Sequence, residues 1–412
     1  MAISGGSRQR QAWVFVVAVV LLAALWLNPL SYGPTPSVIQ WLFTWTGAAI
    51  CWLSTGGGHL GSFSRKRVIP SAWLIAATAS AAMGLMQYFG AAGILGSVVN
   101  SADVGQVYAN LRQRNQLATL LNIGFAALLW QGESTKRDIS QSWGLLPLLI
   151  VLLAAANAAT GSRTGFFQLL LLMALGLCWR RGRAALLWAA IAYLLAAFAL
   201  PVLSGGNLFV NGILSRVAEN GLACTSRLTL WSNVLHLIVQ KPWFGWGWGE
   251  LDYAHFITLY PGERFCEILD NAHNLPLHLA VELGIPVAAA FCGMCVWLIW
   301  RNKPWAETDP TRQMAWSVLA VIGLHSMLEY PLWYGPFQLA VVLCIWLLWR
   351  NPKADVEAAQ TPRLRGALVA RAATGAAAVA LLALCAFVAW DYWRISQIYL
   401  PPTARHAAYQ ED

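Results

Sequence analysis

Charged residues are scarce in this chain of 412 residues, and their scarcity excludes an ordinary soluble domain. Asp, Glu, Lys and Arg make up 11% of the sequence and hydrophobic residues make up 58%, whereas a soluble protein carries about 25% charged residues. The formal net charge of +9 falls mostly on short segments that flank apolar runs, so it gives no indication of a nucleic-acid partner.

Several motifs of nucleotide-binding and metal enzymes are also absent. The sequence has no Walker A motif, so ATP-driven transport would need a separate subunit. It has no HExxH motif and no Asp and His residues clustered at ligand spacing, so nothing in it requires a metal ion or another cofactor. The spaced glycines of GWGWGE (245–250) follow no expected strand, and we interpret them as a tight loop and not as a dinucleotide site.

Long apolar runs are what the chain has in abundance. Each is long enough to cross a hydrocarbon core of about 30 Å as a helix, and a helix satisfies its own backbone hydrogen bonds in lipid. Tryptophans such as Trp179, Trp300 and Trp349 lie at the ends of these runs, as aromatic residues do at membrane interfaces. We therefore predict an all-α polytopic membrane protein with about eleven transmembrane helices. The expected spans are 11–27, 38–55, 69–88, 116–131, 143–159, 164–179, 184–203, 280–300, 313–328, 335–349 and 368–390.

Lysine and arginine residues predict the orientation of these spans. With the N-terminus in the cytoplasm, the inside segments hold 18 of the 27 Lys and Arg residues, although the outside segments are much longer. The segment MAISGGSRQRQ has no small-residue cleavage site, so we expect it to lead into a first membrane helix and not to be a removed signal. The expected parts are N-terminal spans 1 to 7 (1–203), a large outside loop between spans 7 and 8 (204–272), C-terminal spans 8 to 11 (273–390) and an outside tail (391–412).

Two of the eight cysteines, Cys224 and Cys266, lie in the large outside loop. In an oxidising compartment a disulfide between them would close this loop, and two free thiols are the alternative. The other six fall in or beside expected spans and resemble small apolar residues. The C-x-x-C at 292–295 lies in an apolar helix without a histidine partner, so it indicates no metal or redox site.

Four arginines on the outside are unusual for that face of a membrane protein. Arg163 lies in a short turn between two spans, and Arg114 directly precedes a span. Arg216 and Arg227 belong to the large loop, and the leucine spacing after Arg227 predicts an amphipathic helix along the membrane surface. Each arginine alone is equally consistent with a snorkelling anchor. Together they form a cationic cluster suited to a lipid-linked phosphate, because a guanidinium binds phosphate oxygens in bidentate fashion.

The segment DNAHNLPLHLAVELG (270–284) places polar residues at the start of an apolar run. Asp270 or Asn271 is expected to cap the helix. A neutral imidazole at His273 can accept a proton from a hydroxyl group near neutral pH. The alternative for His273 is an interfacial residue whose ring lies among lipid headgroups. Its position on the same face as the arginines favours a catalytic base.

These segments resemble a known family. HNLPLHLAVELGIP resembles the His-Asn motif before a Glu-x-Gly helix in the O-antigen ligase and polymerase superfamily, and GSRTG and RLTLWSNVLHLIVQKPWFGWGWGELDYA are similar to segments of its members. LRQRNQLATLLNIG and the tail DYWRISQIYLPP most resemble the bacterial protein O-oligosaccharyltransferases, the pilin-glycosylation ligases. The resemblance extends from about residue 105 to residue 400.

The resemblance implies a GT-C-like membrane enzyme of the bacterial inner membrane that acts at its periplasmic face. Such an enzyme transfers a glycan from an undecaprenyl-diphosphate carrier, without a cofactor, to a Ser or Thr hydroxyl of a periplasmic protein such as pilin. Lipopolysaccharide ligases use the lipid A-core sugar instead. His273 matches the essential histidine of the family, and Arg163, Arg216 and Arg227 match basic positions that hold the diphosphate. Arg114 is a weaker match.

Two further residues belong to the expected site. Asn274 and Glu282 are expected to orient neighbouring groups, although Glu282 could equally pair with another helix. Many protein ligases continue into a soluble periplasmic domain, whereas this sequence ends at Asp412, which indicates either a short member or a truncated chain.

Three hypotheses follow from the sequence. The first is a protein O-oligosaccharyltransferase, and the second is an O-antigen ligase or polymerase with the same donor and a different acceptor. The third is a flippase or transporter of lipid-linked glycans, which should carry ionisable residues near the bilayer midplane. The charges of this sequence gather at one membrane face, which favours chemistry at the surface.

Overall fold

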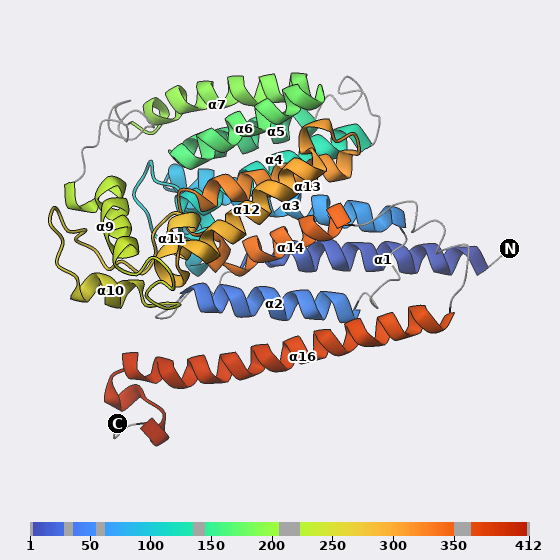
Figure 1. Ribbon diagram of the computed structural model, residues 1–412. Helices are drawn as coiled ribbons and strands as arrows, with labels where there is room; N and C mark the ends of the chain where they lie inside the picture. The colour runs from blue at the N-terminus through green and yellow to red at the C-terminus, as the bar shows by residue number, and fades with distance from the viewer. Residues whose placement is uncertain are drawn as a thin grey trace.

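The computed structural model describes residues 3–28, 36–54, 62–134, 145–205, 223–349 and 364–409. Across these ranges the regular structure is entirely helical. Figure 1 shows long helices that run side by side, with the N-terminus at one end of the bundle and α9, α10 and α11 at the other. The C-terminus lies at the same end as α9 and α10.

The helix boundaries follow the apolar runs of the sequence. The α-helices are α1 (Ile3–Ala24), α2 (Pro36–Ser54), α3 (Ser62–Tyr88), α4 (Arg114–Ser134), α5 (Leu145–Ala159), α6 (Arg163–Trp179), α7 (Arg183–Leu203), α9 (Arg227–Gln240), α10 (Leu251–Ile257), α11 (Leu275–Leu283), α12 (Ile285–Asn302), α13 (Pro310–Ser326), α14 (Gly335–Trp349) and α16 (Leu364–Ser396). Short 3₁₀ turns, among them Ala92–Val98, Ala109–Leu111 and Pro331–Trp333, connect them.

The all-α membrane class predicted from the sequence is confirmed. Each of the eleven expected spans overlaps a helix. By length and hydropathy, four stretches of the described chain could cross a membrane on their own: Arg67–Tyr88, Arg183–Leu203, Ile285–Ala306 and Ala372–Tyr399. The total of eleven spans and the division of the chain into four parts therefore stay predictions.

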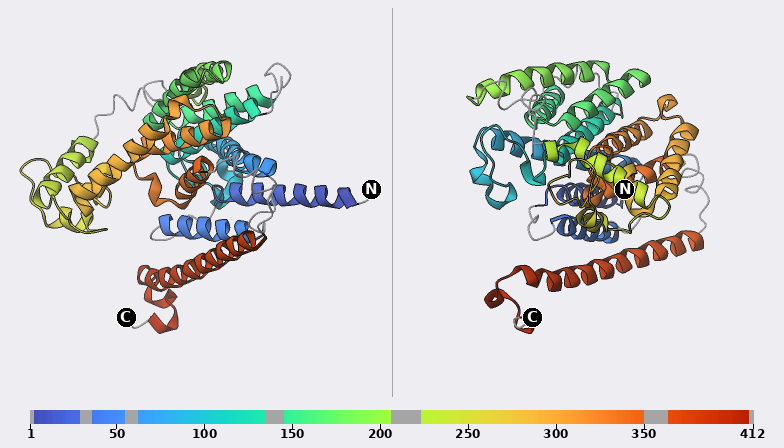
Figure 2. Two further views of the ribbon diagram at one scale, coloured as in Figure 1. Left: turned by 45° about the vertical axis from the view of Figure 1, so that its right-hand side comes forward. Right: turned by 60° about the vertical axis from the view of Figure 1, so that its left-hand side comes forward.

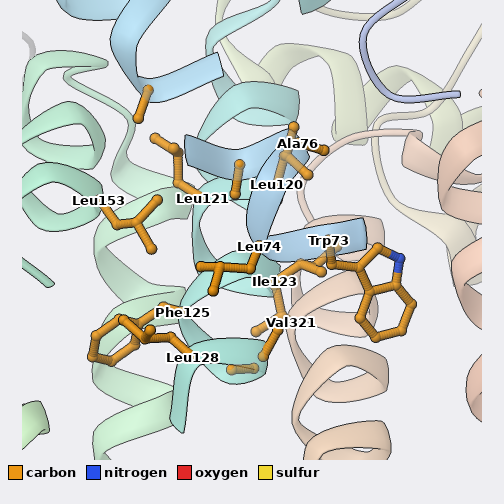
Figure 3. Packing of buried hydrophobic residues seen from close by; sticks show 14 of the residues in the cluster. Trp73, Leu74, Ala76, Leu120, Leu121, Ile123, Phe125, Leu128, Leu153 and Val321 are labelled. Carbon is orange, nitrogen blue, oxygen red and sulfur yellow. The ribbon is translucent and has the colours of Figure 1, made fainter. Parts of the chain in front are cut away.

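Helix α4 lies at the centre of the bundle because its side chains are buried on almost every face. Leu117, Leu120, Leu121 and Ile123 are each buried to at least 99%, and Figure 3 shows three of them beside side chains of α3, α5 and α13. Such close packing between helices in a bilayer depends on small residues at the contacts. Gly124 of α4 faces Ala77 of α3 so closely that a Cβ atom would clash there.

The peripheral helices carry their apolar side chains outward. Helix α16 packs against α2 along one edge of the bundle, and α7 packs against α5 on another side (Figures 1 and 2). In the span that begins with α12, only 6% of the residues are buried by protein, and its exposed side chains include Val296, Trp297 and Trp300. Apolar exposure on this scale fits a surface covered by lipid.

The span expected at 280–300 is wrong at its start, because the chain breaks at Gly284. Helix α11 ends at Leu283, and α12 begins at Ile285 after a glycine with a φ of 89°. A loop that contains GWGWGE packs into this break: Trp246 N donates to the Val281 carbonyl at 2.8 Å, and Ile285 N donates to the Pro242 carbonyl at 2.8 Å. A side chain at Gly284 would clash with the backbone of Trp243. The spaced glycines thus form the tight loop that the sequence predicts.

The described part of the segment 204–272, which the sequence predicts to be an outside loop, has its own small core. Helix α9 begins after Ser226, whose hydroxyl caps it by accepting the Thr229 N–H at 3.1 Å. Its buried face packs against α10 and α11 through residues that include Leu230, Val234, Leu237, Leu251 and Val281. Cys224 and Cys266 form a disulfide with a Cα–Cα distance of 5.4 Å, which ties the start of α9 to the segment that leads toward residue 273. Arg216 lies outside the described residues.

We expect Cys224→Ser to loosen this loop. Opening a cross-link of this length removes about 2–4 kcal/mol of stabilisation, so the thermal unfolding midpoint of the purified protein should fall. On a non-reducing gel the variant should migrate like the reduced parent. Cys292→Ser, which replaces a free thiol in α12, serves as the control. Equal mobility of Cys224→Ser and the unreduced parent would contradict the disulfide.

Candidate functional site

His273 occupies an unusual backbone conformation just before α11. Its φ of 50° lies in the left-handed region, which is uncommon for a residue with a side chain. The side chain of Asn271 supports this turn, because its Oδ1 accepts the His273 N–H at 2.8 Å. A local amide–backbone contact of this kind holds the imidazole in place before the helix begins.

The cap of α11 is Asn274, and the expectation that Asp270 or Asn271 caps the helix is wrong. Asn274 Oδ1 accepts the Leu277 N–H at 3.1 Å, and Asn274 Nδ2 donates to the Met327 carbonyl at 3.0 Å. The reason is the turn at His273, which delays the helix by several residues. Asn274 thereby fastens the start of α11 to the end of α13, so the supporting role expected for it has a structural basis.

Glu329 is the partner of His273. The residue follows the end of α13, where its N–H donates to the His325 carbonyl at 2.8 Å. His273 Nδ1 and Glu329 Oε2 are 2.8 Å apart, and the ring of Tyr330 meets the imidazole edge-on at 5.0 Å between centroids. An ionised carboxylate only accepts hydrogen bonds. Nδ1 therefore carries the proton in this pair, and Nε2 keeps a lone pair that can accept one.

Several neighbours keep Glu329 ionised although it is buried. Burial raises the pKa of the carboxyl, but the hydrogen bond and charge of His273 and the charge of Arg227 outweigh this and hold the pKa below its usual value. Arg227 Nη2 donates to Oε1 in an ion pair, and Asn115 Nδ2 donates to the same oxygen at 3.1 Å. One carboxylate thus connects residues from α4, α9, α13 and the turn before α11.

The hydrogen bonds continue from Asn115 to the start of α6. Ser162 Oγ donates to Asn115 Oδ1 at 2.6 Å and accepts the Gly165 N–H at 2.9 Å as the cap of α6. Arg163 is the first residue of that helix and is exposed, and among the described residues its guanidinium has no partner. Arg114, the first residue of α4, donates to the Tyr108 hydroxyl at 2.7 Å.

Three helices therefore begin with an arginine beside one hydrogen-bonded network: α4 at Arg114, α6 at Arg163 and α9 at Arg227. The N-terminus of a helix carries about half a positive charge and unpaired N–H groups, and both attract anions. The structure brings these three predicted arginines to the network that holds His273. Arg216, the fourth, lies outside the described residues.

Glu282 lies apart from this network. Its side chain is buried in α11, with Oε2 3.5 Å from His278 Nε2, and its carbonyl accepts the Gly247 N–H at 3.0 Å. These contacts hold α11 against the glycine-rich loop. The printed side-chain pair lies within α11 itself, so the role of Glu282 in orienting neighbouring groups stays a prediction.

A second polar cluster lies beneath the site and joins α4, α6 and α13. Thr119 Oγ1 donates to the Asn115 carbonyl at 2.7 Å and lies 2.8 Å from His325 Nδ1. Gln168 Nε2 donates to Thr119 Oγ1 at 2.8 Å and to the Val321 carbonyl at 3.0 Å. Unpaired polar groups are costly where water is excluded, so these bonds fix the register of the three helices that deliver Asn115, Ser162 and Glu329.

Sequence reasoning missed Glu329, Asn115 and Ser162. Glu329 carries a signal in the sequence, because it is an acidic residue directly after an expected span on the arginine-rich face. Asn115 and Ser162 are neighbours in sequence of Arg114 and Arg163, but small polar residues at helix starts are common caps and do not indicate a site on their own. Within the described residues no three His, Cys, Asp or Glu side chains are grouped as metal ligands.

Three segments of the chain match models of known protein families. The family described as O-Antigen ligase matches residues 148–292, which include Arg163, Arg227 and His273. The family described as protein glycosylation ligase matches residues 107–130, which include Arg114 and Asn115. The family described as virulence factor membrane-bound polymerase, C-terminal, matches residues 313–412, which include Glu329.

Two relatives from Acinetobacter baylyi are similar to much of the chain. A general O-oligosaccharyltransferase is 28% identical over 247 residues, which cover 57% of this chain and 42% of the relative. A ComP-specific O-oligosaccharyltransferase is 24% identical over 245 residues, which cover 59% of this chain and 44% of the relative. The matched segment thus spans less than half of either relative. Taken with the three family matches along the sequence, these similarities relate the chain to the O-antigen ligase superfamily.

Proposed function

We propose that the protein is a glycosyltransferase that moves a glycan from undecaprenyl diphosphate to a Ser or Thr hydroxyl of a periplasmic protein such as pilin. It acts at the periplasmic face of the bacterial inner membrane, with its N-terminus in the cytoplasm and about eleven spans. The observation that carries this proposal is the His273–Glu329 pair beside three helix N-termini that each begin with an arginine.

His273 is the proposed general base. Glu329 accepts the Nδ1 proton, so the Nε2 lone pair is free to take the proton of the acceptor hydroxyl. The acceptor oxygen then forms a bond to the anomeric carbon of the glycan while the bond from that carbon to the diphosphate oxygen breaks. Attack from the side opposite the leaving diphosphate inverts the configuration at the anomeric carbon.

The leaving diphosphate gains negative charge in this step, and the arginines are placed to stabilise it. Arg163 has a guanidinium without a partner among the described residues, and Arg114 and Arg227 each retain N–H donors beyond the bonds they make within the protein. Donors that are already oriented toward a developing charge lower a barrier without further reorganisation. Arg216 belongs to the same proposed set. The base and the cations are all side chains, so the proposed reaction needs no metal ion or other cofactor.

The alternatives share part of this chemistry. An O-antigen ligase or polymerase would use the same donor, with the lipid A-core or another glycan as acceptor. Both relatives are O-oligosaccharyltransferases, which favours a protein acceptor. A flippase for lipid-linked glycans would use the arginines but would have no need of a base whose tautomer is set by a carboxylate.

The proposal is tested by supplying a lipid-linked glycan and a candidate pilin to cells that lack their own ligase. The mass of the pilin should increase by that of the glycan when this protein is expressed. Glycan found only on lipopolysaccharide would identify the protein as an O-antigen ligase. Glycan found on neither acceptor, with the lipid-linked donor accumulated outside the membrane, would indicate a transporter.

We expect His273→Ala to lower the rate of transfer by about 10²–10⁴-fold, the usual contribution of a general base. Membrane expression should match the parent, because His273 lies in a turn and is only partly buried. The measurement is glycosylated acceptor per unit of membrane-inserted enzyme. His406→Ala, an exposed histidine of the C-terminal tail, is the matched control and should keep full activity. Retained activity in His273→Ala would remove this residue from the chemistry.

Glu329→Gln should lower kcat by a similar factor, roughly 10²–10⁴. The glutamine amide can donate a hydrogen bond to Nδ1, which would move the imidazole proton to Nε2 and leave no lone pair toward the acceptor. Glu329→Asp keeps the carboxylate and should recover part of the rate. Because the pKa of Glu329 is lowered, the parent keeps this carboxylate ionised through the neutral range, and the stability that it contributes should be lost only as the pH falls through and below the usual titration range of a glutamate carboxyl.

Arg163→Ala should raise the KM for the lipid-linked donor by about 10–100-fold, since a hydrogen bond to a charged group is worth roughly 1.5–3 kcal/mol. The kcat at saturating donor should also fall, because Arg163 is proposed to stabilise the charge that the leaving diphosphate gains in the transition state. Arg227→Ala should lower kcat as well, because Arg227 also pairs with Glu329. An unchanged donor KM in Arg163→Ala would contradict a role in donor binding.

A further inference from the structure

A cleft of about 770 Å³ opens in the outside loop, between α10 and the segment 264–269. This volume lies in the usual range of ligand sites, about 300–1,000 Å³. Large side chains on its walls are exposed: Phe256 by 77%, Tyr253 by 56% and Ile268 by 84%. The remaining wall residues are Asp252, His255, Arg264, Phe265, Cys266, Glu267 and Leu269.

The walls of the cleft are held together by contacts that need no ligand. The Arg264 guanidinium donates to the His255 carbonyl at 2.8 Å and to the Thr258 carbonyl at 3.2 Å, so it bridges the two walls. The His255 ring contacts the Tyr260 hydroxyl at 2.8 Å and the Phe265 carbonyl at 3.1 Å. Cys266 anchors one wall to Cys224. A cleft built in this way is formed before a partner arrives, which lowers the entropic cost of binding.

The cleft carries negative charge. Its walls contain two carboxylates, Asp252 and Glu267, and a single arginine, Arg264, whose guanidinium already donates to the His255 and Thr258 carbonyls. Burial lowers the pKa of His255, so its ring adds no positive charge at neutral pH. The diphosphate donor is an anion, and carboxylates would repel it. The charges on this side of His273 are thus opposite in sign to those of the arginines that begin α4, α6 and α9.

The cleft adjoins the site. Leu269 is one of its wall residues, and Asp270 to His273 follow it directly in the chain. Asp270 interacts electrostatically both with Asp252 on the wall of the cleft and with His273. A molecule seated in the cleft therefore lies near the turn that carries His273.

We propose that this cleft binds the acceptor as a polypeptide segment whose accepting Ser or Thr is flanked by lysine or arginine and by apolar residues. The proposal rests on the proposed function, which requires both an anionic donor and a separate acceptor at His273. The basic side chains pair with Asp252 and Glu267, and the apolar ones contact Tyr253, Phe256 and Ile268. Lipid A-core carries phosphate groups, so the same charges disfavour it.

The test uses the whole protein in detergent or nanodiscs and two fluorescent peptides that differ only in charge. One peptide has lysines on both sides of a serine, and the other has glutamates. Peptide binding is followed by fluorescence anisotropy without donor, and glycan transfer is followed by mass with donor. The variant is Asp252→Lys with Glu267→Lys. The matched control is Glu263→Lys, which reverses an exposed charge of the same segment outside the walls of the cleft.

The parent should prefer the lysine peptide, and its affinity should weaken with added salt. The double variant should weaken binding of this peptide, and raise its KM, by about tenfold or more, with the preference shifted toward the glutamate peptide and kcat little changed. The control should behave like the parent. The donor KM should stay constant in all three proteins, because donor binding is assigned to the arginines.

The possible failures are distinguishable. Transfer to both peptides without any dependence on these charges would overturn the acceptor cleft and leave the proposed function standing. Charge-dependent peptide binding without transfer to any peptide would overturn the proposed function and leave the cleft as a peptide site. Transfer only to lipid A-core, enhanced by Asp252→Lys with Glu267→Lys, would overturn the choice of a polypeptide.

Discussion

The carboxylate of Glu329 is the point on which the described site depends. It accepts hydrogen bonds from His273, Arg227 and Asn115, which come from three separate parts of the chain. A buried carboxylate without partners costs several kcal/mol, and breaking a buried ion pair by removing one member costs about 3–5 kcal/mol. The surrounding helices must therefore place all three partners beside the Glu329 carboxylate. This arrangement fixes the orientation of the His273 imidazole.

The helix bundle meets this constraint with polar contacts below the site. Thr119, Gln168 and His325 join α4, α6 and α13 within one buried cluster. Close packing at Gly165 adds to this, because a Cβ atom there would clash with Ala118 and Asn157. Apolar packing alone would let helices of similar surface slide past one another in a bilayer, whereas directional hydrogen bonds fix one register. The positions of Asn115, Ser162 and Glu329 follow from that register.

The arrangement of charge around His273 has a simple logic in the proposed reaction. Arginines begin α4, α6 and α9, and two carboxylates, Asp252 and Glu267, line the cleft proposed for the acceptor. An enzyme that joins an anionic donor to a second substrate must keep the two apart until they meet at the base. Opposite charges on the two approaches supply this separation, because each side attracts one substrate and repels the other. His273 lies where the two sides adjoin.

The sequence by itself determined the helical membrane class and the candidate residues. The scarcity of charge and the length of the apolar runs leave few other folds, and arginines on the face predicted to lie outside mark a candidate site by their rarity. Residues that are unusual for their location can be found in this way, and His273 was found partly by its position beside them and partly by the family resemblance of HNLPLHLAVELGIP. The break at Gly284 was not found, because the apolar pattern continues through it and only packing of the loop 242–247 requires it.

Only the tertiary structure decided how these residues act together. Glu329 and His273 are 56 residues apart, and Asn115 and Glu329 are 214 apart, so no local pattern could pair them. Asn115 and Ser162 look like ordinary residues at helix starts until the bundle places them against a buried carboxylate. The physical reason is that hydrophobic patterning specifies which face of a helix is buried. Which helix packs against that face, and in which axial register, depends on contacts between the two helices.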